Sequence, residues 1–206
     1  MKNKINLKIF FVLKIFIIYL FLFTTSYSDN LEIKDDWIVI GNHSAPVKIK
    51  IFSSFTCPHC ANFHMDVVPK IKKNYVDSGK VQLIFLDFPL DQAAFNASKL
   101  LHCADKSKQM NLMDAIYENQ IKWTAGSNIN MINENLKEIV KNLGIDSSKF
   151  DRCLVNERIS DKILNERIDG HQKYKINSTP TIVINEKKFE EGSDFKSIKK
   201  KIEKLI

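Results

Sequence analysis

Two apolar, strand-like stretches dominate the first half of the chain. Residues 47–52 alternate between apolar and charged positions before becoming apolar, and residues 81–88 form a second, stronger strand pattern. Between them, apolar residues recur at helical spacing from Phe63 to about Tyr75, and Pro69 is predicted to kink this helix. A short strand candidate at residues 37–40 precedes both stretches. The pattern therefore predicts the order β, β, α, β.

The spacing becomes helical from residue 91 onward and stays so to about residue 175, with no convincing strand. Within this stretch we predict a loop at residues 123–130 and a helix that ends at Gly144. We also predict a short helix whose first turn is capped by Ser147 or Ser148. The middle of the chain is therefore expected to be a block of helices.

The β pattern returns near the end of the chain. Residues 182–184 form an apolar strand pattern, and a tight turn connects them to a short partner strand at residues 188–190. An amphipathic helix closes the chain. One α/β sheet is thus assembled from both ends of the chain around a helical insert, with the parts at residues 29–90, 91–168 and 169–206.

The first 28 residues have the pattern of a secretory signal peptide. Lysines precede an apolar stretch at residues 9–23, and the small residues Ser26 and Ser28 mark a cleavage site after Ser28. The alternative left open is that the segment remains as an uncleaved membrane anchor. An exported chain would reach an oxidising, periplasmic compartment in which disulfides form and persist.

The charge gives no argument for nucleic-acid binding. The chain has 31 basic and 24 acidic residues and a net charge of +7. Four of the basic residues and none of the acidic ones lie in the first 28 positions, so the remainder carries only +3. A basic run at residues 199–201 falls in the closing helix, where it is expected to form a solvated face.

The strongest chemical signal is Cys57-Pro58-His59-Cys60, which lies where a strand leads into a helix. A Cys-x-x-Cys at such a junction is typical of redox-active dithiols, because the helix N-terminus favours a thiolate. We expect Cys57 to be the exposed nucleophile and Cys60, one turn later, the buried resolving cysteine. An imidazole at His59 would stabilise the reduced form and so make the disulfide a stronger oxidant. Pro58 suits the first helical turn.

The two other cysteines, Cys103 and Cys153, remain for each other if the first pair is the active one. In an oxidising compartment they are expected to form a structural disulfide, and a sharper hypothesis is that this bond tunes the active pair. The alternative is two buried free cysteines that pack as small hydrophobic groups.

The chain resembles the DsbA-type thiol:disulfide oxidoreductases. The resemblance rests on the Cys-Pro-His-Cys motif, on its lead-in at residues 41–55, on the segment 88–90 and on Thr179-Pro180 some 120 residues later. It implies a thioredoxin fold with an inserted α-helical domain and a cis peptide bond before Pro180, facing the active cysteines. The exposed backbone of Thr179 would then pair with an extended substrate.

The same resemblance implies an exported, monomeric enzyme that needs no cofactor or metal. It would introduce disulfides into reduced, unfolded or folding exported proteins, and a membrane quinone-linked partner would reoxidise it. The chain differs in two places from the better-known oxidases. They often have an acidic residue within the helix that follows the motif, where this chain has His64, and many of them have Val at the position of Thr179.

Two alternatives stay open. The first is a disulfide isomerase or reductase of the same fold, for which Thr179 is a common residue; the segment before Trp37 is too short for an isomerase-type dimerisation domain. The second is a metal-binding or chaperone module that uses the cysteine pair together with His43, His59 and His64. A zinc site requires four convergent ligands, and His59 is poorly placed to join both cysteines.

Overall fold

A computed structural model describes residues 36–206 except residue 142. The predicted signal peptide, residues 1–28, lies outside the described residues. Within the described part of the chain, no helix is long and apolar enough to cross a membrane.

A five-stranded mixed sheet forms the centre of the fold. Its strands are β1 (Ile38–Ile40), β2 (Val47–Ser53), β3 (Val81–Asp87), β4 (Thr181–Ile184) and β5 (Lys187–Phe189), and their order is β1-β3-β2-β4-β5. Strands β2 and β3 are parallel, and every other pair is antiparallel. The predicted strands at both ends of the chain are thereby confirmed, and β4 joins the sheet directly beside β2.

The connection from β2 to β3 is one long helical run with two π-helical turns. It comprises α2 (Pro58–Asn62), the π-helix η1 (Phe63–Val67), α3 (Val68–Ile71) and the π-helix η2 (Lys72–Val76). Pro69, the predicted kink, is the second residue of α3, just after η1, and has no N–H to donate to the helix. The π-helical turns were not predicted, because an extra residue in a turn leaves no clear mark on apolar spacing.

The insert is helical, as predicted, and no strand occurs in the described residues between β3 and β4. Its helices are α4 (Gln92–Cys103), η3 (Lys106–Lys108), α5 (Gln109–Glu118), α6 (Gln120–Trp123), α7 (Ile129–Lys141), α8 (Ser147–Leu154) and α9 (Glu157–Tyr174). Two details of the prediction were wrong. Trp123 ends a helix instead of opening a loop, because its buried indole packs in the core and donates to the Ile116 carbonyl. The cap of α8 is Asp146, whose carboxylate accepts from the Lys149 N–H at 2.8 Å.

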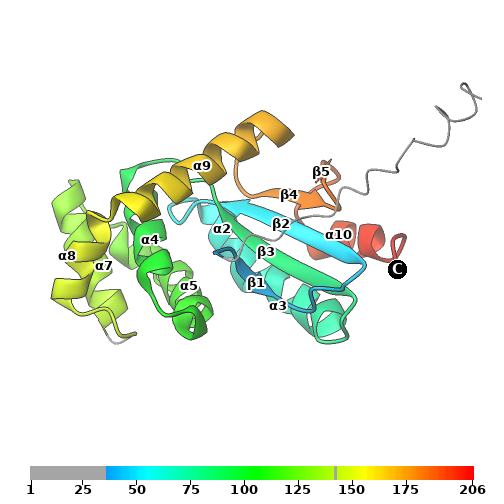
Figure 1. The fold of residues 1–206 in the computed structure, drawn as a ribbon, viewed down its shortest axis with the longest axis horizontal. Coiled ribbons are helices and arrows are strands. Elements are labelled where there is room, and N and C mark those ends of the chain that lie inside the picture. The colour runs from blue at the N-terminus through cyan, green and yellow to red at the C-terminus, as the bar shows by residue number, and fades with distance from the viewer. Residues whose placement is uncertain (1–35, 142) are drawn as a thin grey trace, which may run out of the picture. The chain divides into compact units, whose positions relative to one another are not determined.

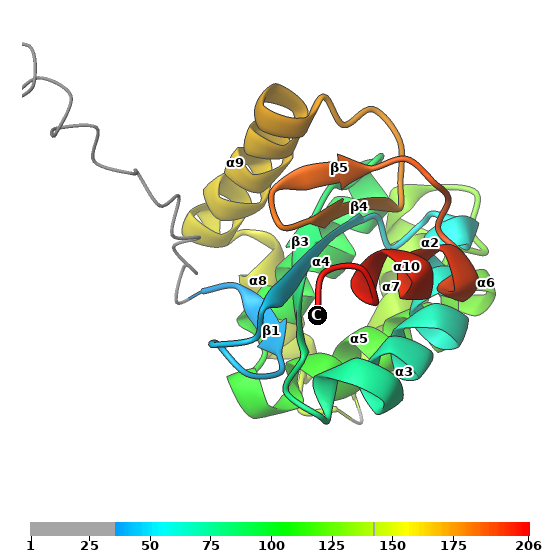
Figure 2. The ribbon, with the colours of Figure 1, turned by 90° about the vertical axis from the view of Figure 1, so that its right-hand side faces the viewer.

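Helices cover both faces of the sheet (Figures 1 and 2). The run α2–η2 and the closing helix α10 (Phe195–Ile202) lie on one face, and α9 lies across the other. Gly170 of α9 lets this helix approach β2 closely, because an added Cβ would lie 2.9 Å from the Phe52 ring. Helix α9 also contacts α4, so it belongs to the insert at one end and to the sheet at the other. The boundary proposed at residue 168 falls within it.

Candidate active site

Cys57 forms the N-cap of α2, four positions after β2 ends at Ser53. Its backbone is extended (φ −81°, ψ 118°), and its carbonyl accepts from the N–H groups of Cys60 at 3.0 Å and Ala61 at 3.2 Å. Pro58 occupies the first turn, where its missing N–H is not needed. His59 follows and is exposed at the surface. The sequence motif is therefore placed as predicted, at the N-terminus of a helix.

The expectation that Cys57 is well exposed is wrong. Only 7% of the residue is accessible, because the loop before β4 covers it and its Sγ donates to the Thr179 carbonyl oxygen at 3.3 Å. Cys57 still remains more accessible than Cys60, of which 1% is exposed. The backbone of Thr179 therefore lies directly against the thiol of Cys57.

Cys60 lies in a different environment, one turn deeper. Burial raises the pKa of its thiol from 9.0 to about 12, and the nearby Thr179 hydroxyl and the Ser54 N–H, 3.5 Å from its Sγ, offset this only in part. The charge of Cys57 raises the pKa of Cys60 further. Both cysteines are free thiols in this structure. A thiolate released at Cys60 would therefore take up a proton readily.

The peptide bond between Thr179 and Pro180 is cis in the structure. Strand β4 begins directly after it and pairs with β2, so that Phe52 lies opposite Thr181. This pairing brings Thr179 beside Cys57, although 122 positions separate them in the chain. The two residues predicted to bind substrate thus lie together with the dithiol.

Gln120 was missed by the sequence reasoning. This buried residue begins α6 of the insert, and its side-chain amide donates to the carbonyl oxygens of Phe55 at 2.7 Å and Cys57 at 3.0 Å. The helical insert therefore holds the segment that carries the nucleophile. No local signal marks this glutamine, because polar residues in a helical stretch are most often exposed.

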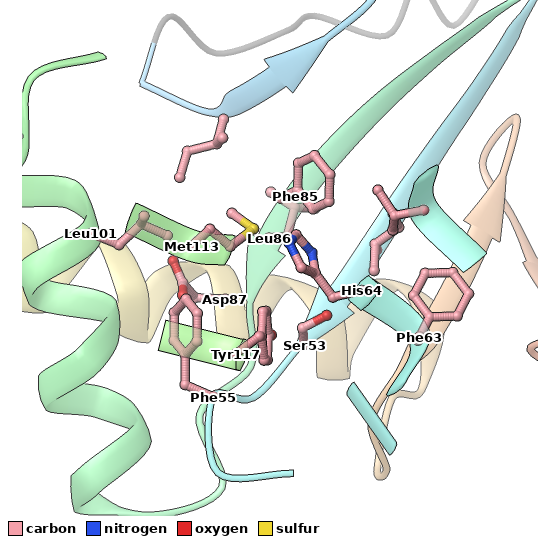
Figure 3. A pocket seen from close by; sticks show the side chains of 13 residues that line it. Ser53, Phe55, Phe63, His64, Phe85, Leu86, Asp87, Leu101, Met113 and Tyr117 are labelled. Atoms are coloured by element: carbon pink, nitrogen blue, oxygen red, sulfur yellow. The ribbon is translucent and has the colours of Figure 1, made fainter. Parts of the chain in front are cut away.

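A small pocket lies among residues of β2, β3, η1 and α5 (Figure 3). Its volume is about 20 Å³, and apolar side chains line it together with Ser53, His64, Asp87 and Tyr117. Figure 3 shows the His64 ring directed between Phe85 and Tyr117, and its centroid lies 4.8 Å from that of Tyr117. Burial raises the pKa of Tyr117 well above its ordinary value.

His64 pairs with Asp114 of α5, with 2.6 Å between Nε2 and Oδ1. In the described part of the chain, no grouping of three or more metal-ligating side chains includes Cys57 or Cys60. The metal-binding alternative, which combined the cysteine pair with His43, His59 and His64, therefore gains no support from the geometry of the described residues.

A second polar cluster joins the sheet to the insert. Asp87, at the end of β3, contacts His102 Nε2 at 2.5 Å and accepts from Ser98 Oγ at 2.5 Å, while its N–H donates to Glu166 at 2.9 Å. Lys162 pairs with Glu166. Burial would raise the pKa of Asp87, but the nearby His102 outweighs burial, and the pKa of Asp87 is lowered. The pKa of Glu166 is raised, because Glu166 is buried and lies near the charge of Asp87. Each carboxylate is thus held by side chains of the insert, and the cluster joins β3 to α4 and α9.

Cys103 and Cys153 form a disulfide that joins the end of α4 to α8. Their pairing matches the one predicted from the sequence. The bond connects two helices of the insert, and it lies in the part of the chain that does not carry the dithiol.

The comparisons with known proteins agree with this arrangement. The thioredoxin family profile matches residues 34–204. "Probable disulfide bond formation protein D" of Bacillus cereus is 31% identical over 176 residues, which cover 81% of this chain and 77% of the relative.

Two solved structures are also similar. Wolbachia pipientis α-DsbA1 superposes with a TM-score of 0.72 at 29% identity over 85% of this chain and 93% of that one. Oxidised BdbD of Bacillus subtilis superposes with a TM-score of 0.72 at 25% identity over 82% and 92%. The chain therefore belongs to the thioredoxin family and, within it, to the DsbA-type protein-disulfide oxidoreductases, enzymes of thiol–disulfide exchange.

Proposed function

We propose that this enzyme is an exported dithiol oxidase that introduces disulfides into reduced client proteins. The observation that carries the proposal is the difference between its two thiols. Cys57 lies at a helix N-terminus beside the Thr179 edge, whereas Cys60 is buried and its pKa is raised to about 12. The difference in access supports Cys57 as the attacked sulfur, because Cys60 is only 1% exposed, and Cys60 is then the sulfur that leaves and, with its raised pKa, takes up a proton.

The proposed cycle begins with the Cys57–Cys60 disulfide. A client thiolate attacks Cys57 Sγ, the bond between the two enzyme sulfurs breaks, and Cys60 leaves and takes up a proton. A second client thiolate then attacks the client sulfur of the mixed disulfide, and Cys57 leaves as a thiolate. The client loses two electrons and gains a disulfide, and the enzyme dithiol holds those electrons.

The direction of exchange is supported by the position of Cys57. Cys57 caps the N-terminus of α2, where unpaired N–H groups favour an anionic group, and this would stabilise the reduced enzyme relative to its disulfide. The carbonyl of Thr179, 3.3 Å from Cys57 Sγ, belongs to an edge at which an extended client could form backbone hydrogen bonds. Unfolded clients of diverse sequence suit this mode, because it uses main-chain groups.

The remaining parts of the proposal concern location and partners. The pattern of residues 1–28 supports export to the periplasm, and a membrane quinone-linked protein would return the dithiol to its disulfide. We propose that the enzyme works as a monomer without a cofactor. Fusing residues 1–28 to a reporter enzyme that is active only after export tests the location: an inactive fusion would contradict it.

The equilibrium of Cys57 and Cys60 with glutathione tests the oxidase function. We expect a reduction potential well above that of thioredoxin, which is about −270 mV, together with reactivation of a reduced client by the oxidised enzyme. A potential near that of thioredoxin and no client oxidation would overturn the proposal. Reactivation of a client with scrambled disulfides, but not of a reduced one, would instead indicate an isomerase.

A further inference from the structure

An open groove begins at Thr56, the residue before the active cysteine. Its volume is about 380 Å³, within the range of roughly 300–1,000 Å³ typical of ligand sites. Thr56, the residue before Cys57, forms one end. The start of α4, the segment between α6 and α7 and the first turn of α7 form the walls. Their polar residues are Asp91, Gln92, Thr124, Ser127 and Asn128, and their apolar side chains are Ala93, Ile129 and Ile132.

The groove and the Thr179 edge form two different walls around the nucleophile. Thr56 Oγ1 donates to Asp91 Oδ2 at 2.7 Å, whereas the next residue, Cys57, directs its thiol to Thr179. Gln120, four positions before Thr124, donates to the Cys57 carbonyl and so holds the insert wall against the motif. A polypeptide that reacts at Cys57 therefore meets the Thr179 edge on one side and the groove on the other.

The chemistry of the walls limits what the groove can accept. Among the described residues that line it, Asp91 is the only one with an ionised side chain, and the others offer hydroxyl, amide, backbone or apolar atoms. A small anionic thiol such as glutathione would meet a carboxylate and no cation. A peptide segment with neutral or basic side chains would meet hydrogen-bonding groups and, at Asp91, a negative charge.

We propose that this groove binds the client segment adjoining the reacting cysteine and that Asp91 selects for basic side chains in that segment. The inference rests on the proposed function, since it assumes that Cys57 reacts with polypeptide clients. Asp91 is exposed, and its two oxygens accept from Thr56 and from the Ala94 N–H at 2.8 Å, which leaves acceptor capacity toward solvent. The insert thus supplies one wall of a two-sided client site and a source of charge selectivity.

The test uses single-cysteine peptides that differ only in a Lys or a Glu two or three residues from the cysteine, on either side of it. Second-order rate constants of mixed-disulfide formation with the oxidised enzyme are measured at low ionic strength. When the charged residue lies on one of the two sides of the peptide cysteine, we expect the Lys peptide to react about two- to fivefold faster than the Glu peptide. This rate ratio corresponds to the free energy of an exposed ion pair. Adding 0.5 M salt should reduce the ratio, because salt screens the charges.

Asp91→Asn should remove most of this preference, because Asn keeps the cap of α4 and an acceptor for Thr56 but lacks the charge. The matched control is Asp146→Asn. Asp146 caps α8 in the same way, also at 2.8 Å, and α8 lies at the outer end of the insert (Figure 1). This variant should keep the wild-type preference. An equal Lys-to-Glu rate ratio in wild type and Asp91→Asn would overturn the role of Asp91.

A second variant tests the groove itself. Ser127 is exposed on its wall, and Ser127→Trp would fill it. The ratio of the rate constant for a ten-residue peptide to that for N-acetylcysteine amide should fall at least fivefold. An unchanged ratio would overturn the groove as a client site. The Lys-to-Glu ratio and the ratio of long to short peptide do not depend on the direction of thiol–disulfide exchange. A low reduction potential would therefore overturn the proposed oxidase function and leave the groove proposal standing.

Discussion

The side-chain amide of Gln120 donates a hydrogen bond to the carbonyl oxygen of Cys57 at 3.0 Å, across 63 positions of the chain. The same nitrogen donates to Phe55 at 2.7 Å. The Cys57 carbonyl also accepts the first two backbone bonds of α2, so the insert and the helix hold this peptide group together. The insert therefore acts on the dithiol through the backbone of the nucleophile.

Replacing Gln120 by Ala should affect both stability and chemistry. The buried Phe55 and Cys57 carbonyls lose their side-chain donor, which is expected to lower the free energy of unfolding by about 1–3 kcal/mol. With its position less fixed, Cys57 should react several-fold more slowly with a model thiol. Urea unfolding and stopped-flow exchange measure the two effects.

The matched control is Gln109→Ala. Gln109 is also buried and donates to a carbonyl, that of Leu101, at 3.3 Å, but it does not contact the Cys57 segment. It should lose stability without a change in exchange rate. If Gln120→Ala also kept its exchange rate, Gln120 would have only a structural role.

The buried thiol of Cys60 should titrate at high pH even without its partner. In Cys57→Ser, burial remains the largest cause of the raised pKa, so thiolate absorbance at 240 nm should appear well above pH 9. Alkylation of Cys60 by iodoacetamide at pH 8 should be at least about tenfold slower than alkylation of Cys57 in Cys60→Ser. A Cys60 titration at pH 9 or below would show that the site opens to water.

The ion-pair network around Glu186 should make stability depend on acid pH. Burial would raise the pKa of Glu186, but hydrogen bonds from Lys173, Lys50 and Tyr174 outweigh it and lower that pKa from 4.5 to about 2. Because the folded pKa is the lower one, the stabilisation is present above pH 4.5 and is lost as the pH falls toward 2.

Glu186→Gln should therefore lower the free energy of unfolding by about 1–2 kcal/mol at pH 7, less than the full shift implies because solvent screens part of the interaction. The difference from wild type should narrow between pH 4.5 and pH 2. Glu190→Gln is the control, because Glu190 forms an exposed pair with Lys188 in the same hairpin. A constant difference between wild type and Glu186→Gln across this range would contradict the assignment.

Removing the Cys103–Cys153 disulfide should lower stability without unfolding the enzyme. The bond closes a segment of 50 residues, and the double variant Cys103→Ala/Cys153→Ala is expected to lose about 2–4 kcal/mol, measured by urea unfolding. The same variant tests whether this bond tunes the active pair. A reduction potential of Cys57 and Cys60 equal to that of wild type would remove that hypothesis.

Several features of the site were predictable because they depend on local signals. Cys57 and Cys60 lie at a strand-to-helix junction that apolar spacing reveals, and Pro58 suits a first helical turn wherever that helix packs. The pairing of Cys103 with Cys153 followed once Cys57 and Cys60 were taken as the active pair, because only two cysteines then remain. No residue near Thr179-Pro180 in the chain indicates that it lies beside Cys57. It could be predicted only from its resemblance to a family motif.

The features that were missed depend on contacts between distant segments. The low exposure of Cys57 results from the loop before β4, which β-sheet pairing brings over the motif. The network of Asp87, His102 and Glu166 joins residues from three elements, and each looks alone like an ordinary polar residue. Gln120 is the clearest case, because nothing beside it in the chain explains its burial.

The sequence by itself determined the fold class and the chemistry, since alternation, helical spacing and a Cys-x-x-Cys at a helix start are properties of neighbouring residues. Only the tertiary structure decided how the two thiols differ, what covers Cys57 and which insert residues reach it. Those properties depend on burial and on hydrogen bonds between segments up to 122 positions apart, and hydrophobic patterning specifies which residues are buried without specifying their partners.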